Sequence, residues 1–272
     1  MKAADDEGRL AALERELDAV GQGLDVDFAQ GSDWRRGVLS FAHRARSLYR
    51  GFRTLCDTDQ RRAAFILVRP LVDMTITLAW LAADPDLRLE RWLADQNRLD
   101  RYLEGLLADI GRADQRDGFD AERAAAVARA REHMVAAGIE KDRLLPPMEQ
   151  RAREVDQALR AGSATTGEHD PAHPYLEAYV LAFGPLSDHV HLGSNAFNDL
   201  MAEHVDGMVL LRDEAGVDLA PLRVLAGSTF AHLLEITSRE ADLGLEAEIS
   251  ELRRGFMAFG RDRPGHLPVP TR

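Results

Sequence analysis

The segment from residue 63 to residue 83 constrains the fold of this chain more than any other. It is the longest apolar run, and Arg69, Pro70 and Asp73 interrupt it. A helix that is apolar on all sides is usually buried on all sides. Because charges and a proline break the run, we expect a core helix of a soluble protein rather than a membrane span. Pro70 removes one backbone donor and predicts a kink.

Arg69 and Asp73 are the two charged residues of this segment, four positions apart. In a helix they share one face and can pair. Burial of two charges is costly unless both are paired, and loss of one partner costs about 3–5 kcal/mol. The pair is therefore either a structural ion pair that steadies the kink or part of a pocket that binds an anionic ligand.

Hydrophobic spacing predicts helices through most of the remaining chain. The clearest is a heptad seam that alternates steps of four and three, formed by Trp34, Val38, Phe41, Ala45, Leu48, Phe52 and Leu55. Further helices are predicted over about 10–20, 84–110, 120–137, 147–162, 174–186, 220–242 and 246–259, with an exposed loop over 162–173. A small hairpin is predicted near 208–219, from Met208–Leu211 and Val217–Leu219. The fold class is all-α: a single-domain multi-helix bundle over 1–260 around a buried central helix, with a flexible tail over 261–272.

Composition limits the classes of partner. The net charge of −12 argues against DNA and against anionic membranes as partners. Cys56 is the only cysteine, which excludes an internal disulfide and a cysteine-based zinc site. The acidic N-terminus has no apolar signal core, so we expect a cytoplasmic protein. Of the 34 basic residues only Lys2 and Lys141 are lysine, which we interpret as the coding bias of a GC-rich bacterial genome.

Charge is distributed unevenly near the N-terminus. Residues 34–62 carry eight arginines against two acids, whereas residues 1–33 carry nine acids against three bases. The basic stretch could form an RNA-binding face. We favour local cancellation between an acidic first helix and a basic second helix, because the aromatic residues of the second helix belong to its apolar seam.

A second polar cluster lies in the sequence Ser187-Asp188-His189-Val190-His191. In a helix His189 and His191 point to nearly opposite sides and cannot form a two-histidine metal site. Ser187 and His191 share a face, and Tyr179 lies on roughly the same stripe. A histidine in this setting is either a general acid or base near neutral pH or a core histidine held by hydrogen bonds.

Two patterns resemble metal ligands. His169-Asp170 is an adjacent pair of the kind found in helical phosphohydrolases, but it lies in a loop rich in Pro and Gly. His232 and Glu235 have the spacing of a carboxylate-bridged metal pair, yet no second pair of this kind is present on another predicted helix. We therefore predict no metal and no cofactor.

The third and seventh predicted helices resemble an uncharacterised bacterial all-helical family, a domain of unknown function. The segment Phe65–Asp73 resembles its helix with an apolar run followed by Arg-x-Leu-x-acidic, and Tyr179–His191 resembles its later Tyr…Ser-x-x-x-His helix. The family has Glu where this chain has Asp73. The resemblance covers about half of the chain and implies an architecture rather than an activity.

Such helical proteins are compared with HEPN domains, which include ribonucleases with an Arg four to six residues before a His on one helix. Here that spacing occurs only from Arg261 to His266, in the tail. An Arg69 and His191 pair from two helices would imitate it.

Our leading hypothesis is a helical binding or interaction protein, homodimeric and part of a bacterial defence or stress module. Its pocket would contain Arg69, Asp73, Tyr179, Ser187 and His191, with His189 nearby. The alternative is an enzyme, a HEPN-like phosphodiesterase that acts on RNA or a nucleotide. In that case His191 is the acid or base and Arg69 holds the phosphate.

Overall fold

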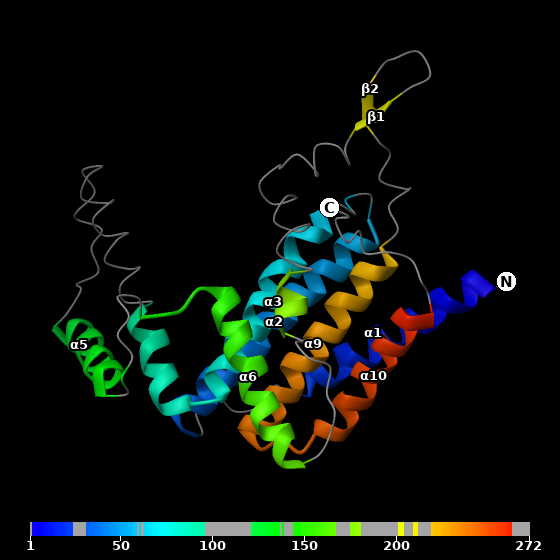
Figure 1. The fold of residues 1–272 in the computed structure, drawn as a ribbon. Coiled ribbons are helices and arrows are strands. Elements are labelled where there is room, and N and C mark those ends of the chain that lie inside the picture. The colour runs from blue at the N-terminus through cyan, green and yellow to red at the C-terminus, as the bar shows by residue number, and fades with distance from the viewer. Residues whose placement is uncertain are drawn as a thin grey trace.

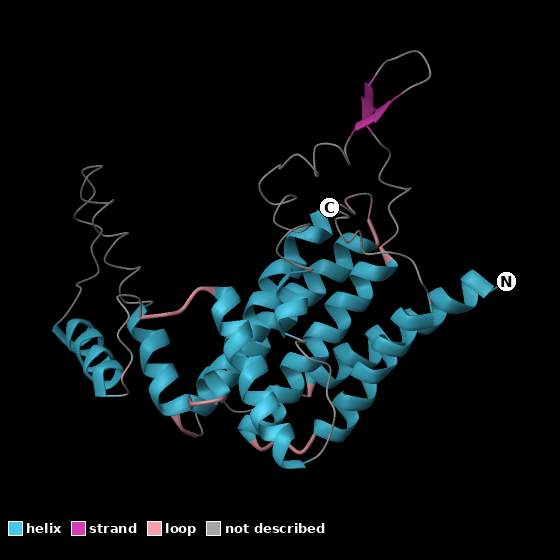
Figure 2. Ribbon diagram, viewed as in Figure 1, coloured by secondary structure: helices cyan, strands magenta, loops and turns pink. Residues whose placement is uncertain are grey.

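The computed structural model describes residues 2–23, 31–58, 60, 63–95, 121–136, 138, 144–166, 175–180, 201–203, 209–211 and 219–262. The fold is all-α, as the sequence predicts: the described regular structure is helical apart from one short pair of strands (Figure 2). The predicted tail lies outside these ranges from residue 263 onward.

Three helices form the centre of the fold, and each packs against the other two (Figure 1). They are α2 (Asp33–Cys56), α3 (Ala63–Ala82) and α9 (Ala220–Ala241). Three more helices surround them: α1 (Lys2–Gln22), α6 (Met148–Thr166) and α10 (Glu246–Asp262). Helix α10 packs along α9, α6 packs along α3, and α1 contacts α2, α9 and α10.

The apolar seam of α2 packs inside this chain. Helix α2 is capped by Ser32, whose Oγ accepts a hydrogen bond from the Arg35 amide at 3.2 Å. Every seam residue is buried or half-buried. Four residues beside the seam are also buried: Leu39, Ala42, Tyr49 and Cys56. The apolar stripe is wider than a heptad seam because α2 faces both α3 and α9.

Helix α3 is buried on all sides only in its C-terminal half. Residues 75–81 are all buried, whereas Arg69, Pro70 and Asp73 are half-buried and Ile66 is exposed. The prediction of a helix buried on every side is therefore wrong for its first half. Helices α2 and α9 cover two sides, and the hydrogen bonds between α6 and α3 are made at Thr77 and Trp80, toward the far end.

By length and composition alone, α3 is the one described helix that could cross a membrane. The charges and the proline within it are thus not sufficient to exclude a span. However, 61% of its most apolar stretch is buried inside the protein. Packing against α2, α6 and α9 therefore accounts for its apolar character.

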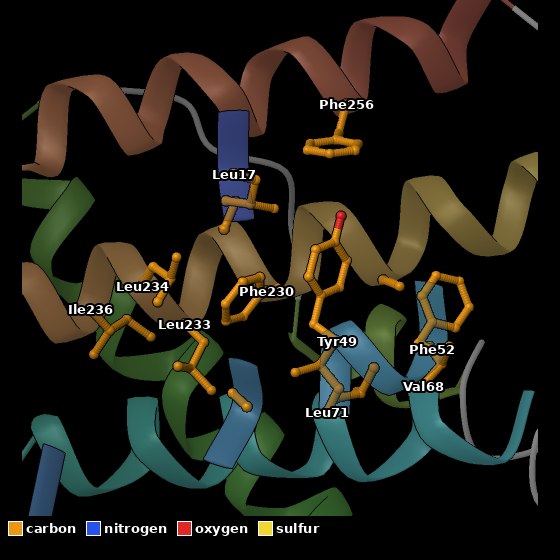
Figure 3. Close-up of a cluster of buried hydrophobic side chains, with 14 of the residues drawn as sticks. Leu17, Tyr49, Phe52, Val68, Leu71, Phe230, Leu233, Leu234, Ile236 and Phe256 are labelled. Atoms are coloured by element: carbon orange, nitrogen blue, oxygen red, sulfur yellow. The ribbon is translucent and has the colours of Figure 1, made fainter. Parts of the chain in front are cut away.

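Large side chains from five helices meet in the main core (Figure 3). Tyr49 of α2 stands between Phe230 of α9 and Phe52, with ring centroids 4.7 Å and 6.3 Å away. Leu17 of α1 and Phe256 of α10 close the same cluster (Figure 3). The core therefore depends on residues from both ends of the chain.

A second, smaller core lies beside the first. Helix α5 (Ala121–Ala136) contributes Ala130 and Met134, which pack with Ala94 of the helical residues 85–95 and with Leu144. In Figure 1, α5 lies at the side of the bundle. The α5 bounds agree with the predicted 120–137 helix.

The predicted hairpin and the end of α6 need correction. Strand β2 (Val209–Leu211) occurs where it was predicted, and its partner is β1 (Met201–Glu203); residues 217 and 218, predicted for the other strand, lie outside the described residues. Leu219 instead directly precedes α9. Helix α6 continues four residues past Gly162 into the predicted loop, because glycine weakens a helix without ending it and the next proline is Pro171.

Helices α9 and α10 approach each other closely at Gly227. A Cβ at this position would lie 2.3 Å from Phe256 Cε1. Gly227→Ala should lower the free energy of unfolding by about 1–3 kcal/mol through overpacking. At Gly37 in α2 a Cβ would meet nothing within 4 Å, so Gly37→Ala should raise it by about 0.5–1 kcal/mol. Urea unfolding measures both, and the same sign for both substitutions would contradict this packing.

Candidate functional site

Four side chains with polar groups lie along one face of α3: Arg69, Asp73, Thr77 and Trp80. Their spacing of four, four and three residues places them on one stripe of the helix. We call this stripe the α3 polar face. It faces α6 and the helical residues 85–95, which contribute the partners described below.

Arg69 and Asp73 pair, as the sequence predicts. Arg69 Nε lies 3.9 Å from Asp73 Oδ2, and 22% and 34% of the two side chains are exposed. Burial raises the pKa of the Asp73 carboxyl above its ordinary value, although the Arg69 and Arg151 guanidiniums act in the opposite direction. The pair is a loose one at the edge of the core, and desolvation dominates its carboxylate.

Tyr179, which lies in the helical residues 175–180, is the third described residue of the predicted pocket. Its pKa is raised by burial and by the carboxylates of Glu149 and Asp73, and Arg69 lowers it. The hydroxyl therefore lies within electrostatic range of the Arg69–Asp73 pair. Three of the residues predicted to form the pocket therefore interact electrostatically.

The buried carboxylate of Asp156 on α6 fixes the start of this short helix. Its two oxygens accept hydrogen bonds from the backbone amides of Tyr175 and Leu176, each at 3.0 Å. The orphan donors of a helix N-terminus are thus satisfied by a residue from another helix. No local sequence pattern around Tyr175 indicates this cap.

The remaining predicted site residues, Ser187, His189 and His191, lie outside the described residues. Their roles stay predictions. The same holds for the His169-Asp170 pattern.

The C-terminal end of the α3 polar face is organised around the buried Trp80. Its indole Nε1 donates to Glu154 Oε2 at 2.7 Å. Three guanidinium carbons lie near the ring centroid, at 4.8 Å for Arg88, 5.3 Å for Arg91 and 5.8 Å for Arg151. Arg88 Nη1 donates to the Trp80 carbonyl at 2.6 Å. Such cation–π geometry stabilises each arginine against the ring face.

Backbone carbonyls hold two of these arginines in place. Arg91 Nε donates to the Leu144 carbonyl and Arg151 Nε to the Pro146 carbonyl, both at 2.9 Å. Arg151 Nη1 also donates to Thr77 Oγ1 at 3.1 Å. Sequence reasoning missed the three arginines, because the spacing of Arg88 and Arg91 shows a shared face but not the helix that this face contacts.

A second polar cluster joins α9, α10 and the helical residues 175–180. The Tyr175 hydroxyl and His232 Nε2 form a hydrogen bond, and His232 Nδ1 lies 3.3 Å from Glu235 Oε2. Arg253 Nη1 lies 3.0 Å from the same oxygen. Among the residues that the structure describes, no group of three or more His, Cys, Asp or Glu could hold a metal ion. Here Arg253 is the cation beside the His232–Glu235 pair.

The charges of the basic α2 are partly neutralised inside the chain. Asp18 and Glu14 of α1 lie 3.8 Å and 3.9 Å from Arg46 and Arg53 of α2. Glu14 also binds Arg223 of α9 with its two oxygens at 2.9 Å and 2.6 Å. This supports the prediction that an acidic first helix offsets a basic second one.

The raised pKa of Asp73 predicts that the free energy of unfolding depends on pH. Since the folded-state pKa lies above the unfolded value of about 3.9, protonation of Asp73 favours the folded state. Its contribution to stability is present below about pH 3.9 and is lost as the pH rises through the folded-state pKa. Relative to Asp73→Asn, the wild type should therefore lose free energy of unfolding as the pH rises above about 4. Urea unfolding of both proteins measures the difference, and a difference that grows with pH would contradict a desolvated carboxylate.

The lowered pKa of His232 predicts the opposite dependence of stability on pH. Burial lowers the pKa of its imidazole, more strongly than Glu235 raises it. A base with a depressed folded-state pKa contributes stability that is present above its unfolded value of about 6.5 and is lost as the pH falls below it. Relative to His232→Gln, the wild type should lose thermal stability between about pH 7 and about pH 5. An equal loss of melting temperature in the two proteins over this pH range would contradict a lowered pKa for His232.

Comparison with known proteins gives one match. The profile of a family of unknown function (DUF5677) matches residues 36–208, more than half of the chain. No curated protein and no solved structure matches the chain. The matched region contains the whole α3 polar face with its partners from α6 and 85–95, whereas His232, Glu235 and Arg253 lie beyond it. This agrees with the resemblance that the Phe65–Asp73 and Tyr179–His191 segments predict.

Proposed function

The chain belongs to this family of unknown function, DUF5677, and we propose that it is a binding protein whose ligand lies at Arg69, Asp73 and Tyr179. The observation that carries the proposal is the partly exposed Arg69–Asp73 pair, 3.9 Å apart, with the Tyr179 hydroxyl within electrostatic range of it. A hydrogen-bond donor, an acceptor and an aromatic side chain are there within reach of one small molecule.

The chemistry of the Arg69–Asp73 pair defines the ligand. A guanidinium only donates and a carboxylate only accepts, so the pair complements a planar edge that both accepts and donates. A nucleobase has such edges, and it can stack on an aromatic ring. A donor from the ligand would also compensate Asp73 for the desolvation that raises its pKa. We therefore assign the base of a nucleotide or of RNA to this place.

A phosphodiesterase activity of the HEPN type is the second candidate. One observation favours it: the segment that carries Ser187 and His191 begins directly after the helical residues 175–180, whose Tyr179 lies within electrostatic range of Arg69. In this version His191 is the general acid or base and Arg69 holds the phosphate. For either candidate we propose a cytoplasmic homodimer of a bacterial defence or stress module, on the basis of composition and resemblance.

Binding is tested by titration calorimetry with adenosine and guanosine. Asp73→Asn should weaken binding by about tenfold or more, because a hydrogen bond to a charged group contributes about 1.5–3 kcal/mol. Arg254→Gln is the control, since Arg254 is exposed on α10 and bonds to Ser250 Oγ of the same helix at 3.3 Å. Failure of both nucleosides to bind, or equal binding by wild type and Asp73→Asn, would overturn the proposal.

The enzyme alternative needs a separate measurement. RNA oligonucleotides and mononucleotide esters are incubated with the wild type and with His191→Ala. The alternative predicts cleavage by the wild type and its loss in the variant. Cleavage that survives the substitution would exclude His191 as the acid or base.

A further inference from the structure

The other end of the α3 polar face brings together three positive charges, of which only Arg88 has a carboxylate at ion-pair distance among the described residues. The guanidiniums of Arg88, Arg91 and Arg151 lie within 4.8–5.8 Å of the centroid of one ring, that of Trp80. They come from two separate segments, the helical residues 85–95 and α6. Convergence of three cations on one aromatic side chain brings like charges together, which is unfavourable by itself.

Within the described part of the chain, one carboxylate lies at ion-pair distance from any of these three cations. Glu154 Oε2 lies 3.8 Å from Arg88 Nη2 and already accepts the Trp80 indole N–H. Within the described part of the chain, neither Arg91 nor Arg151 has a carboxylate at ion-pair distance. Beyond ion-pair distance, Asp84 acts on Arg88 and Arg91, and Asp95 and Asp73 act on Arg151 more strongly than Glu154 does.

Partial burial makes the approach of these three charged guanidiniums to one another costly. Desolvation is the largest cause that lowers the pKa of each of the three guanidiniums. Arg88 lowers the pKa of Arg91 further, and Arg91 lowers that of Arg151. Arginine does not deprotonate in proteins, so all three remain charged. Arg91 is 5% exposed, and a charge this deeply buried normally has a counter-ion.

We propose that a phosphate group binds among Arg88, Arg91 and Arg151 beside Trp80. Within the described residues, Glu154 is the one carboxylate at ion-pair distance from any of the three guanidiniums, so a phosphate monoester dianion would give Arg91 and Arg151 the direct ion pairs that they lack there. Arginine forks pair with two oxygens of such a tetrahedral anion at once.

The side chains of this site are preorganised. The Nε atoms of Arg91 and Arg151 are committed to the Leu144 and Pro146 carbonyls at 2.9 Å, which fixes both guanidinium planes. The Trp80 ring lies within cation–π distance of all three guanidiniums. Glu154, with 30% of its side chain exposed, and Arg88, with 17%, mark the solvent side of the cluster. Preorganised donors of this kind lose little entropy when the anion binds.

This inference does not depend on the proposed base site at Arg69 and Asp73. Inorganic phosphate tests it alone, and a phosphate on a larger molecule is tested by AMP. If both sites are correct, AMP occupies the two ends of one face, and Arg151 lies between them, because it reaches Thr77 and influences Asp73.

Binding of inorganic phosphate and of AMP is measured by calorimetry at low salt, with adenosine as the reference for the base alone. Arg91→Met and Arg88→Gln should each weaken phosphate binding by about tenfold or more. Arg153→Gln is the matched control, because Arg153 lies on α6 two residues from Arg151, is 53% exposed and pairs with Glu149. It should bind phosphate as the wild type does.

A stability measurement separates a ligand site from a structural network. Phosphate should raise the urea midpoint of the wild type and of Arg153→Gln but not that of Arg91→Met. The urea midpoint of Arg91→Met without phosphate is its own reference, because the substitution removes a repelled charge and also the hydrogen bond to the Leu144 carbonyl. If Arg91→Met does not fold, Arg88→Gln gives the same comparison.

Each outcome decides the inference. Phosphate binding that needs Arg91 or Arg88 supports it, and tighter binding of AMP than of phosphate identifies a nucleotide as the source of the phosphoryl group. Adenosine binding without phosphate binding would uphold the proposed function and overturn this inference. Phosphate binding that the arginine substitutions leave unchanged would also overturn it.

Discussion

The packing of α3 between α2 and α9 is the constraint on which the rest of the structure depends. Its apolar residues fill the main core, and residues 75–81 are buried throughout. Two sides of α3 pack against α2 and α9, where Thr75 is a buried polar residue that bonds to the Leu71 carbonyl; Thr77 and Trp80 instead bond to α6. Burial of the apolar side thus determines where charged side chains from other segments can meet.

The sequence predicted the architecture well because helical spacing is a local property. The α2 seam, the capped start of α2 and the bounds of α9 follow from residues close together in the chain. The pairing of Arg69 with Asp73 follows from the same local geometry. Their half-buried state could not be predicted, because it depends on how far along α3 helix α6 extends its contacts. The carboxylate of Asp156 that caps Tyr175 from another helix is likewise a tertiary feature.

Desolvation, rather than pairing, dominates the electrostatics of this face. It raises the pKa of Asp73 and lowers the pKa of Arg88, Arg91 and Arg151, so each charged form is less favourable than in water. The Glu14–Arg223 pair behaves differently, since hydrogen bonding raises the pKa of Arg223 and two oxygens meet one guanidinium. A fully satisfied pair of this second kind stabilises the fold. The desolvated arginines of the first kind, two of which have no carboxylate at ion-pair distance among the described residues, are suited to a ligand.

The most direct measurement of the central claim, that the α3 polar face binds the ligand, follows the arginine Nε–H and tryptophan indole signals by NMR during titration with AMP. The account predicts shifts for Arg69, Arg88, Arg91 and Arg151 and for the Trp80 indole, because these groups line one face. Arginines on the exposed side of α2, such as Arg44 and Arg50, should keep their positions. Shifts confined to those α2 arginines, with the α3 face unchanged, would contradict it.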